Sequence, residues 1–226
     1  MSFIVAIDGP AGSGKGTVAN RIANELNLVN IDTGATYRCL ALAVLRAGVE
    51  ISDTENILKV FDSISIEIQG TNQEQTIVLN NEDVTQKIRS FEVTQVVSQI
   101  SAIPEVRLRL VEFQRMLANN KNVIMDGRDI GTYVFPNADV KIYLDASLEE
   151  RAKRRYQENL EKGIEASYEE VLENIRMRDR QDKAKEIGAL KVADDAVVID
   201  STNFTIDEVV KQVKEIIKQK AKEKKI

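Results

Sequence analysis

The chain has 226 residues, of which 43% are hydrophobic and 30% charged, a mixture typical of one globular unit that can bury a core. A net charge of -5 argues against a protein that wraps a nucleic acid polymer, because such binding depends on many Lys and Arg contacts to phosphates. One cysteine and no histidine exclude an internal disulfide and any mechanism that uses imidazole as a base or metal ligand.

The chain begins with a short apolar run, residues 3–7, that is typical of a strand and lacks the basic flank of a secretory signal. No later stretch is apolar for the ~20 residues that a membrane span requires. We therefore expect a cytoplasmic protein without a membrane partner.

Short β-rich apolar runs alternate with helical patterns along the chain. The predicted strands are 3–7, 28–31, 123–125, 140–144 and 196–199. The predicted helices are 15–26, 36–47, 104–118, 148–160, 168–185 and 206–222. This alternation predicts an α/β fold with three layers, in which helices cover both faces of a parallel sheet.

One segment, residues 63–84, interrupts the alternation of strands and helices. Apolar and polar residues alternate on both sides of Gly70-Thr-Asn, which is the pattern of a β-hairpin. We expect a small antiparallel insert between the second and third strands of the parallel sheet.

The first predicted strand leads directly into a glycine-rich segment that opens a helix, the setting of a phosphate-binding loop. The residues predicted to bind the phosphates of ATP are Gly9, Pro10, Ala11, Gly12, Ser13, Gly14, Lys15, Gly16 and Thr17. Glycines let successive backbone N–H groups point at phosphate oxygens, and the amino end of the helix adds partial positive charge. Lys15 is predicted to reach the β and γ phosphates, and the Thr17 hydroxyl to lie near Mg²⁺.

Two further polar segments follow predicted strands, Asp32-Thr-Gly-Ala-Thr-Tyr-Arg and Asp126-Gly-Arg-Asp-Ile-Gly-Thr. Ligands of open α/β sheets bind beyond the carboxyl ends of the strands, so both segments are candidates for a second substrate site. Asp126 ends an apolar strand and is predicted to act on Mg²⁺ through water. An acceptor that is itself a phosphate demands a cluster of cations, and Arg38 and Arg128 lie in these segments.

A GTP-dependent switch is the alternative from a different functional class, and it requires an Asn-Lys-x-Asp motif. The nearest match, Asn120-Lys-Asn-Val, lacks the aspartate and precedes a strand. The spare arginines favour a kinase over a switch. A kinase for UMP, AMP or a non-nucleotide alcohol remains the alternative within the enzyme class.

Several motifs along almost the whole chain resemble the bacterial cytidylate kinases, which belong to the nucleoside monophosphate kinases. They are Gly-Lys-Gly-Thr of the phosphate loop, the two acceptor segments, Ser98-Gln with Pro104-Glu-Val-Arg, Lys141-Ile-Tyr-Leu-Asp-Ala and Asp200-Ser-Thr. Asp-Gly-Arg-Asp followed by Gly-Thr is the most specific of them. The resemblance implies transfer of the γ-phosphoryl group of ATP to CMP or dCMP, with Mg²⁺, by a monomer.

The resemblance also implies a division of the single kinase domain and a set of site residues. The core would comprise about 1–32, 120–150 and 165–226, the lobe that binds the monophosphate about 33–119, and a short lid about 151–164. The substrate-binding residues would be Thr33, Tyr37, Arg38, Ser98, Arg107, Arg128, Asp129, Arg178 and Asp182. The catalytic residues would be Lys15, Arg128, Arg155 and Arg178.

Within that set, Ser98, Arg107 and Asp129 would contact cytosine. Arg38 and Arg128 would bind the acceptor phosphate, and Arg178 with Asp182 the sugar side, while Arg151, Arg154 or Arg155 would come from the lid. A carboxylate at 129 can accept from the amino group of cytosine but meets an oxygen in uracil, so CMP should be preferred to UMP.

The chain departs from the family pattern at three positions. Thr33 stands where a serine is expected, Lys185 stands in the segment after Asp182 where an arginine is usual, and the following Gly188-Ala-Leu-Lys lacks an expected proline. Lysine keeps the charge but lacks the bidentate fork that suits a phosphate, so Lys185 is not assigned as a phosphate ligand.

Overall fold

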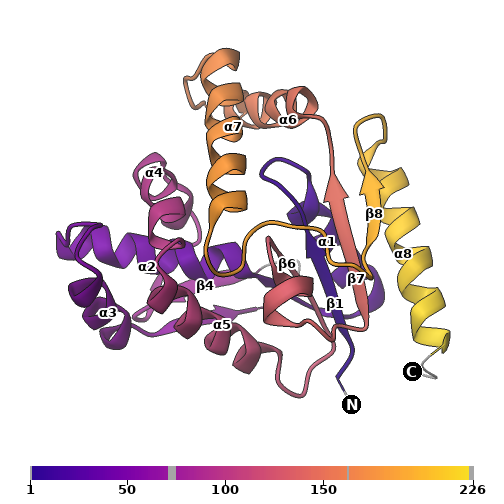
Figure 1. The fold of residues 1–226 in the computed structure, drawn as a ribbon, viewed down its shortest axis with the longest axis horizontal. Coiled ribbons are helices and arrows are strands. Elements are labelled where there is room, and N and C mark those ends of the chain that lie inside the picture. Colours follow the sequence, from indigo (N-terminus) through magenta and orange to yellow (C-terminus); the bar gives the residue numbers. More distant parts are fainter. Residues whose placement is uncertain (1, 71–74, 162, 224–226) are drawn as a thin grey trace.

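The computed structural model describes residues 2–70, 75–161 and 163–223, and Figure 1 shows their arrangement. The central sheet has five parallel strands in the order β2-β6-β1-β7-β8. Their bounds are β1 Ile4–Asp8, β2 Val29–Asp32, β6 Val123–Gly127, β7 Val140–Asp145 and β8 Val197–Asp200. All five predicted strands are confirmed, each within one or two residues of its predicted ends.

The alternation of side chains along β1 sends apolar groups to both faces of the sheet. Val5 and Ile7 pack on one face against helices α1, Lys15–Leu26, and α8, Ile206–Glu223. Ala6 packs on the other face, against α5, Pro104–Ala118, and a single π-helical turn at Ile130–Val134. Because successive side chains of a strand point to opposite faces, a strand buried on both must be apolar throughout. The predicted three-layer α/β fold is confirmed.

A lobe of helices and a small sheet lies beside the sheet, between β2 and β6 in the chain (Figure 1). Its helices are α2 Thr33–Ala47, α3 Thr54–Ser63 and α4 Phe91–Ile100, which pack with α5 around Leu40 and Leu110. Its strands β3 Ile66–Gln69, β4 Thr76–Leu79 and β5 Glu82–Asp83 are antiparallel. The predicted antiparallel insert is confirmed, although residues 71–74, which include part of its predicted turn, lie outside the described residues.

Three features of this lobe differ from the sequence expectation. Helix α2 begins at Thr33 rather than at 36, because the Asp32 carboxylate accepts a hydrogen bond from Ala35 N at 3.1 Å and caps the helix earlier. Helices α3 and α4 were not predicted. Each is capped by a side chain, since Asp53 accepts from Asn56 N and Ser90 accepts from Val93 N.

Helices α6, Leu148–Glu161, and α7, Tyr168–Ala184, lie above the carboxyl ends of the strands (Figure 1). Arg151 of α6 donates to Ala11 O just after β1, and Asp182 of α7 pairs with Arg128 just after β6. These contacts place both helices over the edge where ligands bind in such folds. Among the helices of the described residues, none is long and apolar enough to cross a bilayer.

Candidate active site

The phosphate loop connects the end of β1 to the start of α1. Gly12 and Gly14 have φ of 78° and 85°, a left-handed conformation that glycine adopts readily. No side chain caps the amino end of α1, and the buried Ser13 hydroxyl has no hydrogen-bond partner. Orphaned donors at a helix amino end form a ready anion site, so the loop suits a polyphosphate.

Lys15 and Asp126 are buried at the ends of adjacent elements. Lys15 Nζ donates to Pro10 O at 3.0 Å. Burial, with repulsion from Arg128, lowers the pKa of Lys15, while burial and the neighbouring charge of Asp32 raise the pKa of Asp126. Asp126 Oδ1 is buried without a hydrogen-bond partner. A triphosphate and a cation at this point would satisfy both groups.

A first cavity of about 460 Å³ opens on the α1 side of the phosphate loop. Its walls are Gly12, Ser13, Gly14, Thr17, Val18, Glu150, Arg154, Arg155, Glu158, Ser201, Phe204, Ile206 and Val209. The residues after β8 were not predicted as site residues. Their position beyond the carboxyl end of a strand is the sequence signal that could have identified them.

A second cavity of about 270 Å³ lies on the other side of the loop. All nine predicted substrate-binding residues line it: Thr33, Tyr37, Arg38, Ser98, Arg107, Arg128, Asp129, Arg178 and Asp182. Lys15 and Asp126 line it as well, and Lys185 adds a further cation. Gly12 lines both cavities, so the phosphate loop separates them.

Five arginines line the second cavity, Arg38, Arg89, Arg107, Arg128 and Arg178. Burial, with repulsion from Arg128 and Arg38, lowers the pKa of Arg178 to about 10, and its buried Nε has no hydrogen-bond partner. Burial also lowers the pKa of Arg38 to about 10. Arg38 is held by Ile88 O and Thr94 Oγ1 at 3.0 and 2.9 Å. Cations gathered against their mutual repulsion are typical of a site for a polyanion.

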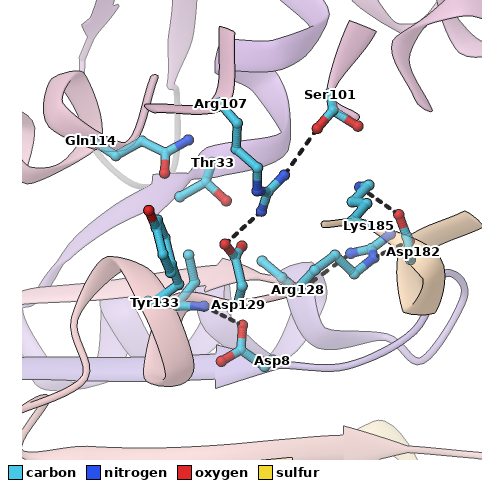
Figure 2. Close-up of polar contacts among 12 residues, drawn as sticks. Asp8, Thr33, Ser101, Arg107, Gln114, Arg128, Asp129, Tyr133, Asp182 and Lys185 are labelled. Carbon is cyan, nitrogen blue, oxygen red and sulfur yellow. Dashed lines mark hydrogen bonds and ion pairs between the residues drawn. The ribbon is translucent and has the colours of Figure 1, made fainter. Parts of the chain in front are cut away.

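Arg107 and Asp129 form a buried ion pair in the wall of the second cavity (Figure 2). Arg107 NH2 lies 2.5 Å from Asp129 Oδ2, and the two side chains are 3% and 6% exposed. Arg107 NH1 donates to Ser101 O, and the guanidinium lies over the ring of Tyr37, 5.5 Å from its centroid. Arg107 Nε has no hydrogen-bond partner. Arg107 and Asp129 therefore offer a ligand one hydrogen-bond donor and one acceptor where water is largely excluded. In such a place hydrogen bonds discriminate strongly between ligands.

Asp182 joins α7 to the second polar segment. Its carboxylate accepts from Arg128 Nε at 2.8 Å and from Lys185 Nζ at 2.7 Å (Figure 2). Burial opposes its ionisation, but the charges of Arg128 and Lys185 outweigh this and hold the pKa of Asp182 well below its usual range. Lys185 is thus committed to Asp182 in this structure.

The three arginines proposed for the lid have different surroundings. Arg151 is buried and donates to Ala11 O, Ala146 O and Asp179. Arg154 donates to Glu150 and to the side chain and carbonyl of Ser201. Arg155 makes an i,i+3 pair with Glu158 at 2.8 Å and faces the first cavity. Of the predicted site residues, Ser13, Gly14, Thr17 and Arg155 thus line the first cavity and not the second.

Comparison with known proteins identifies the family of this chain. The family model described as "Cytidylate kinase" matches residues 5–219. Cytidylate kinases from Caldicellulosiruptor saccharolyticus and Fusobacterium nucleatum are 50% and 48% identical, over 94% and 92% of this chain and 94% of each relative. An uncharacterized protein from Eubacterium ventriosum shares the fold, with a TM-score of 0.53 and 13% identity over 97% of this chain and 99% of its own. The chain belongs to the cytidylate kinase family.

Proposed function

We propose that the protein transfers the γ-phosphoryl group of ATP to CMP or dCMP, giving ADP and CDP or dCDP. The observation that carries the proposal is that Gly12 of the phosphate loop lines both cavities. A triphosphate held on this loop from the first cavity presents its terminal phosphate to an acceptor in the second. Membership of the family supports the same donor and acceptor.

ATP occupies the first cavity and the phosphate loop. The triphosphate takes the N–H groups of residues 9–17 and the Lys15 ammonium, and the Ser13 hydroxyl gains the partner that it lacks. The adenosine part lies between Arg154 and the segment after β8, where Phe204 is 42% exposed and offers an aromatic surface.

The residues around the loop fit a magnesium ion. Among the described residues, no group of three or more acidic, cysteine or histidine side chains is arranged to hold a metal ion. Mg²⁺ is usually held by one or two carboxylates together with phosphates and waters. Thr17 and Asp126, whose Oδ1 has no hydrogen-bond partner, would hold it, Asp126 through water. When bound, Mg²⁺ supplies positive charge that offsets the charge of the phosphates.

CMP occupies the second cavity. Arg38 and Arg128 bind its phosphate, and Arg178 with Asp182 lies on the sugar side, while Thr33 and Tyr37 complete the wall. Ser98, Arg107 and Asp129 contact the base. The amino group of cytosine donates to Asp129, and the adjacent ring nitrogen accepts from Arg107. Uracil would instead turn a carbonyl oxygen toward Asp129 and an N–H toward Arg107, so neither hydrogen bond could form.

The reaction is a direct displacement. An oxygen of the acceptor phosphate forms a bond to the γ phosphorus, the bond from that phosphorus to the β–γ bridging oxygen breaks, and ADP leaves with the electron pair. The acceptor phosphate is largely ionised at neutral pH, so no general base is needed. Lys15, Arg128, Arg155 and Arg178 offset the charge that is being transferred, each with a Coulomb energy of ~4 kcal/mol at ~4 Å and an effective dielectric of ~20, before desolvation.

Closure of the site accompanies the reaction in this proposal. The lobe of about 33–119 and the lid of about 151–164 move against the core, which excludes water from the γ phosphate. Arg155 is the lid residue assigned to the transferring group, because Arg151 and Arg154 are already engaged with the loop and with Ser201. The protein acts as a cytoplasmic monomer.

A coupled ADP-release assay with MgATP tests the proposal against CMP, dCMP, UMP, AMP, GMP and no acceptor. Strong turnover with CMP and dCMP and weak turnover with UMP is expected. ADP release that no acceptor changes, or stronger turnover with another acceptor, would contradict the assigned function.

A further inference from the structure

Asp8 is a buried carboxylate at the end of β1, and it has no role in the proposed reaction. Its Oδ1 accepts from Ile130 N and its Oδ2 from Gly131 N, each at 2.7 Å, and Figure 2 shows it beneath Asp129. The residue is 5% exposed. Asp8 thus caps the turn at Ile130–Val134 from a neighbouring strand.

Asp129 occupies the position from which that turn is normally capped. It is the residue before the turn, and its carbonyl accepts from Tyr133 N and Val134 N, as the N-cap of a helical turn does. Aspartate is among the best N-cap residues, because its carboxylate reaches the free N–H groups of its own turn. Here the Asp129 side chain makes no such bond and points instead to Arg107.

We propose that Asp8 is a positioning residue for base recognition, which caps the 130–134 turn in place of Asp129 and so leaves the Asp129 carboxylate directed at Arg107 and the base. The inference rests on the proposed function, because it assumes that Asp129 contacts the base. Without Asp8, the Asp129 carboxylate stands at the N-cap position of the turn, from which an aspartate side chain can reach the freed N–H groups. Asp129 then turns back to cap its own turn and leaves the acceptor cavity.

The same contact ties the two substrate sites together. Asp8 immediately precedes Gly9, the first residue of the phosphate loop, and the turn that it caps immediately follows Asp129. β1 and β6 are also paired in register, with Asp8 opposite Gly127. The base-contacting loop is therefore fixed to the strand that carries the donor loop.

The test compares Asp8→Ala and Asp8→Asn with wild type by the ratio of kcat/KM for CMP to kcat/KM for UMP at pH 8. Burial raises the pKa of Asp8 to about 6, so the carboxyl is ionised at that pH. The ratio is independent of the fraction of enzyme that is folded, since misfolded protein lowers both values equally. A merely structural role would not change it.

We expect the ratio to fall about fivefold to tenfold in Asp8→Ala, the factor that corresponds to the loss of a helix cap. Asp8→Asn keeps one acceptor oxygen, so its ratio should lie between those of Asp8→Ala and wild type. Asp139→Asn is the matched control, because the Asp139 carboxylate accepts from Ile4 N at 2.6 Å at the opposite end of the same strand. Its ratio should equal that of wild type.

A double-mutant cycle tests whether Asp8 acts through Asp129. If it does, Asp8→Ala combined with Asp129→Ala gives the ratio of Asp129→Ala alone. A wild-type ratio in both Asp8 variants, an equal change in Asp139→Asn, or effects that multiply in the double mutant would overturn the inference. Wild-type enzyme that does not prefer CMP would overturn the proposed function, and the inference with it.

Discussion

Arg128 and Asp182 form an ion pair between the end of β6 and helix α7, with Arg128 Nε 2.8 Å from Asp182 Oδ2. Lys185 Nζ approaches the other oxygen of the same carboxylate at 2.7 Å. The pair connects the segment after β6 with helix α7. One carboxylate therefore holds two cations in place around the acceptor cavity.

This pair should make stability depend on pH in the acid range. The pKa of Asp182 in the folded protein is held below its ordinary value of about 3.9. The ionised carboxylate therefore contributes to the free energy of unfolding above about pH 3.9, and this contribution is lost as the pH falls further. Asp182→Asn should lower the free energy of unfolding by on the order of 3 kcal/mol at pH 7. Urea unfolding at several pH values should show this difference shrinking below about pH 4. A difference that is constant with pH would mean that the pair does not stabilise the ionised carboxylate.

Lys15→Ala should abolish phosphoryl transfer while the fold persists. The lysine is buried beside Arg128, so its removal relieves a repulsion and should leave the melting temperature unchanged or raised. Turnover with ATP and CMP should fall by at least ~10³, as when a group that stabilises the transition state is lost. Turnover within a few-fold of wild type would exclude the assignment of Lys15 to the triphosphate.

Asp129→Ala should narrow the preference for CMP over UMP. A single bidentate base contact is worth about 1–3 kcal/mol, so the ratio of kcat/KM values should fall by roughly 5-fold to 150-fold. The KM for ATP should change little, because Asp129 lines the second cavity and does not line the first, where ATP is proposed to bind. An unchanged ratio would mean that other groups recognise the base.

The arginines of α6 should separate into a catalytic and a structural group. Arg155→Ala should lower kcat by about 10² without lowering the melting temperature, because its ion pair with Glu158 joins two half-exposed side chains and contributes little to stability. Arg151→Ala removes a buried guanidinium that holds Asp179 and Ala11 O, and it should cost about 3 kcal/mol of stability. Full kcat in Arg155→Ala together with loss of kcat in Arg154→Ala would reassign the lid residue to Arg154.

The parallel sheet and the two polar segments after β2 and β6 were predictable from local sequence patterns, whereas Ser98, Arg107, Arg178 and Asp182 of the acceptor cavity came from the family resemblance. Buried strands are continuous apolar runs, and the polar segments that follow them must meet at the carboxyl edge of the sheet. Asp32, Asp126 and the residues after them were found in this way.

Helices α3 and α4 were missed, although each carried a sequence signal. Asp53 and Ser90 are good N-cap residues in front of segments with helical spacing. The run at Phe91–Ile100 is rich in β-branched valines, which have low intrinsic helix propensity, and packing against α2 outweighs that preference.

The positioning role proposed for Asp8 could not have been predicted from the sequence. It depends on the register of β1 against β6, which places one carboxylate opposite two N–H groups more than a hundred residues away in the chain. The first cavity also required the structure, because α1, α6 and the segment after β8 contribute to it from distant parts of the sequence.

The central claim is direct phosphoryl transfer between two nucleotides, and following the transferred group tests it most directly. ATP labelled at the γ phosphate is incubated with the protein, Mg²⁺ and CMP, and the products are separated. The account predicts that the label appears in CDP in proportion to the ADP formed, with little inorganic phosphate. Label that is released as inorganic phosphate whether or not CMP is present would contradict it.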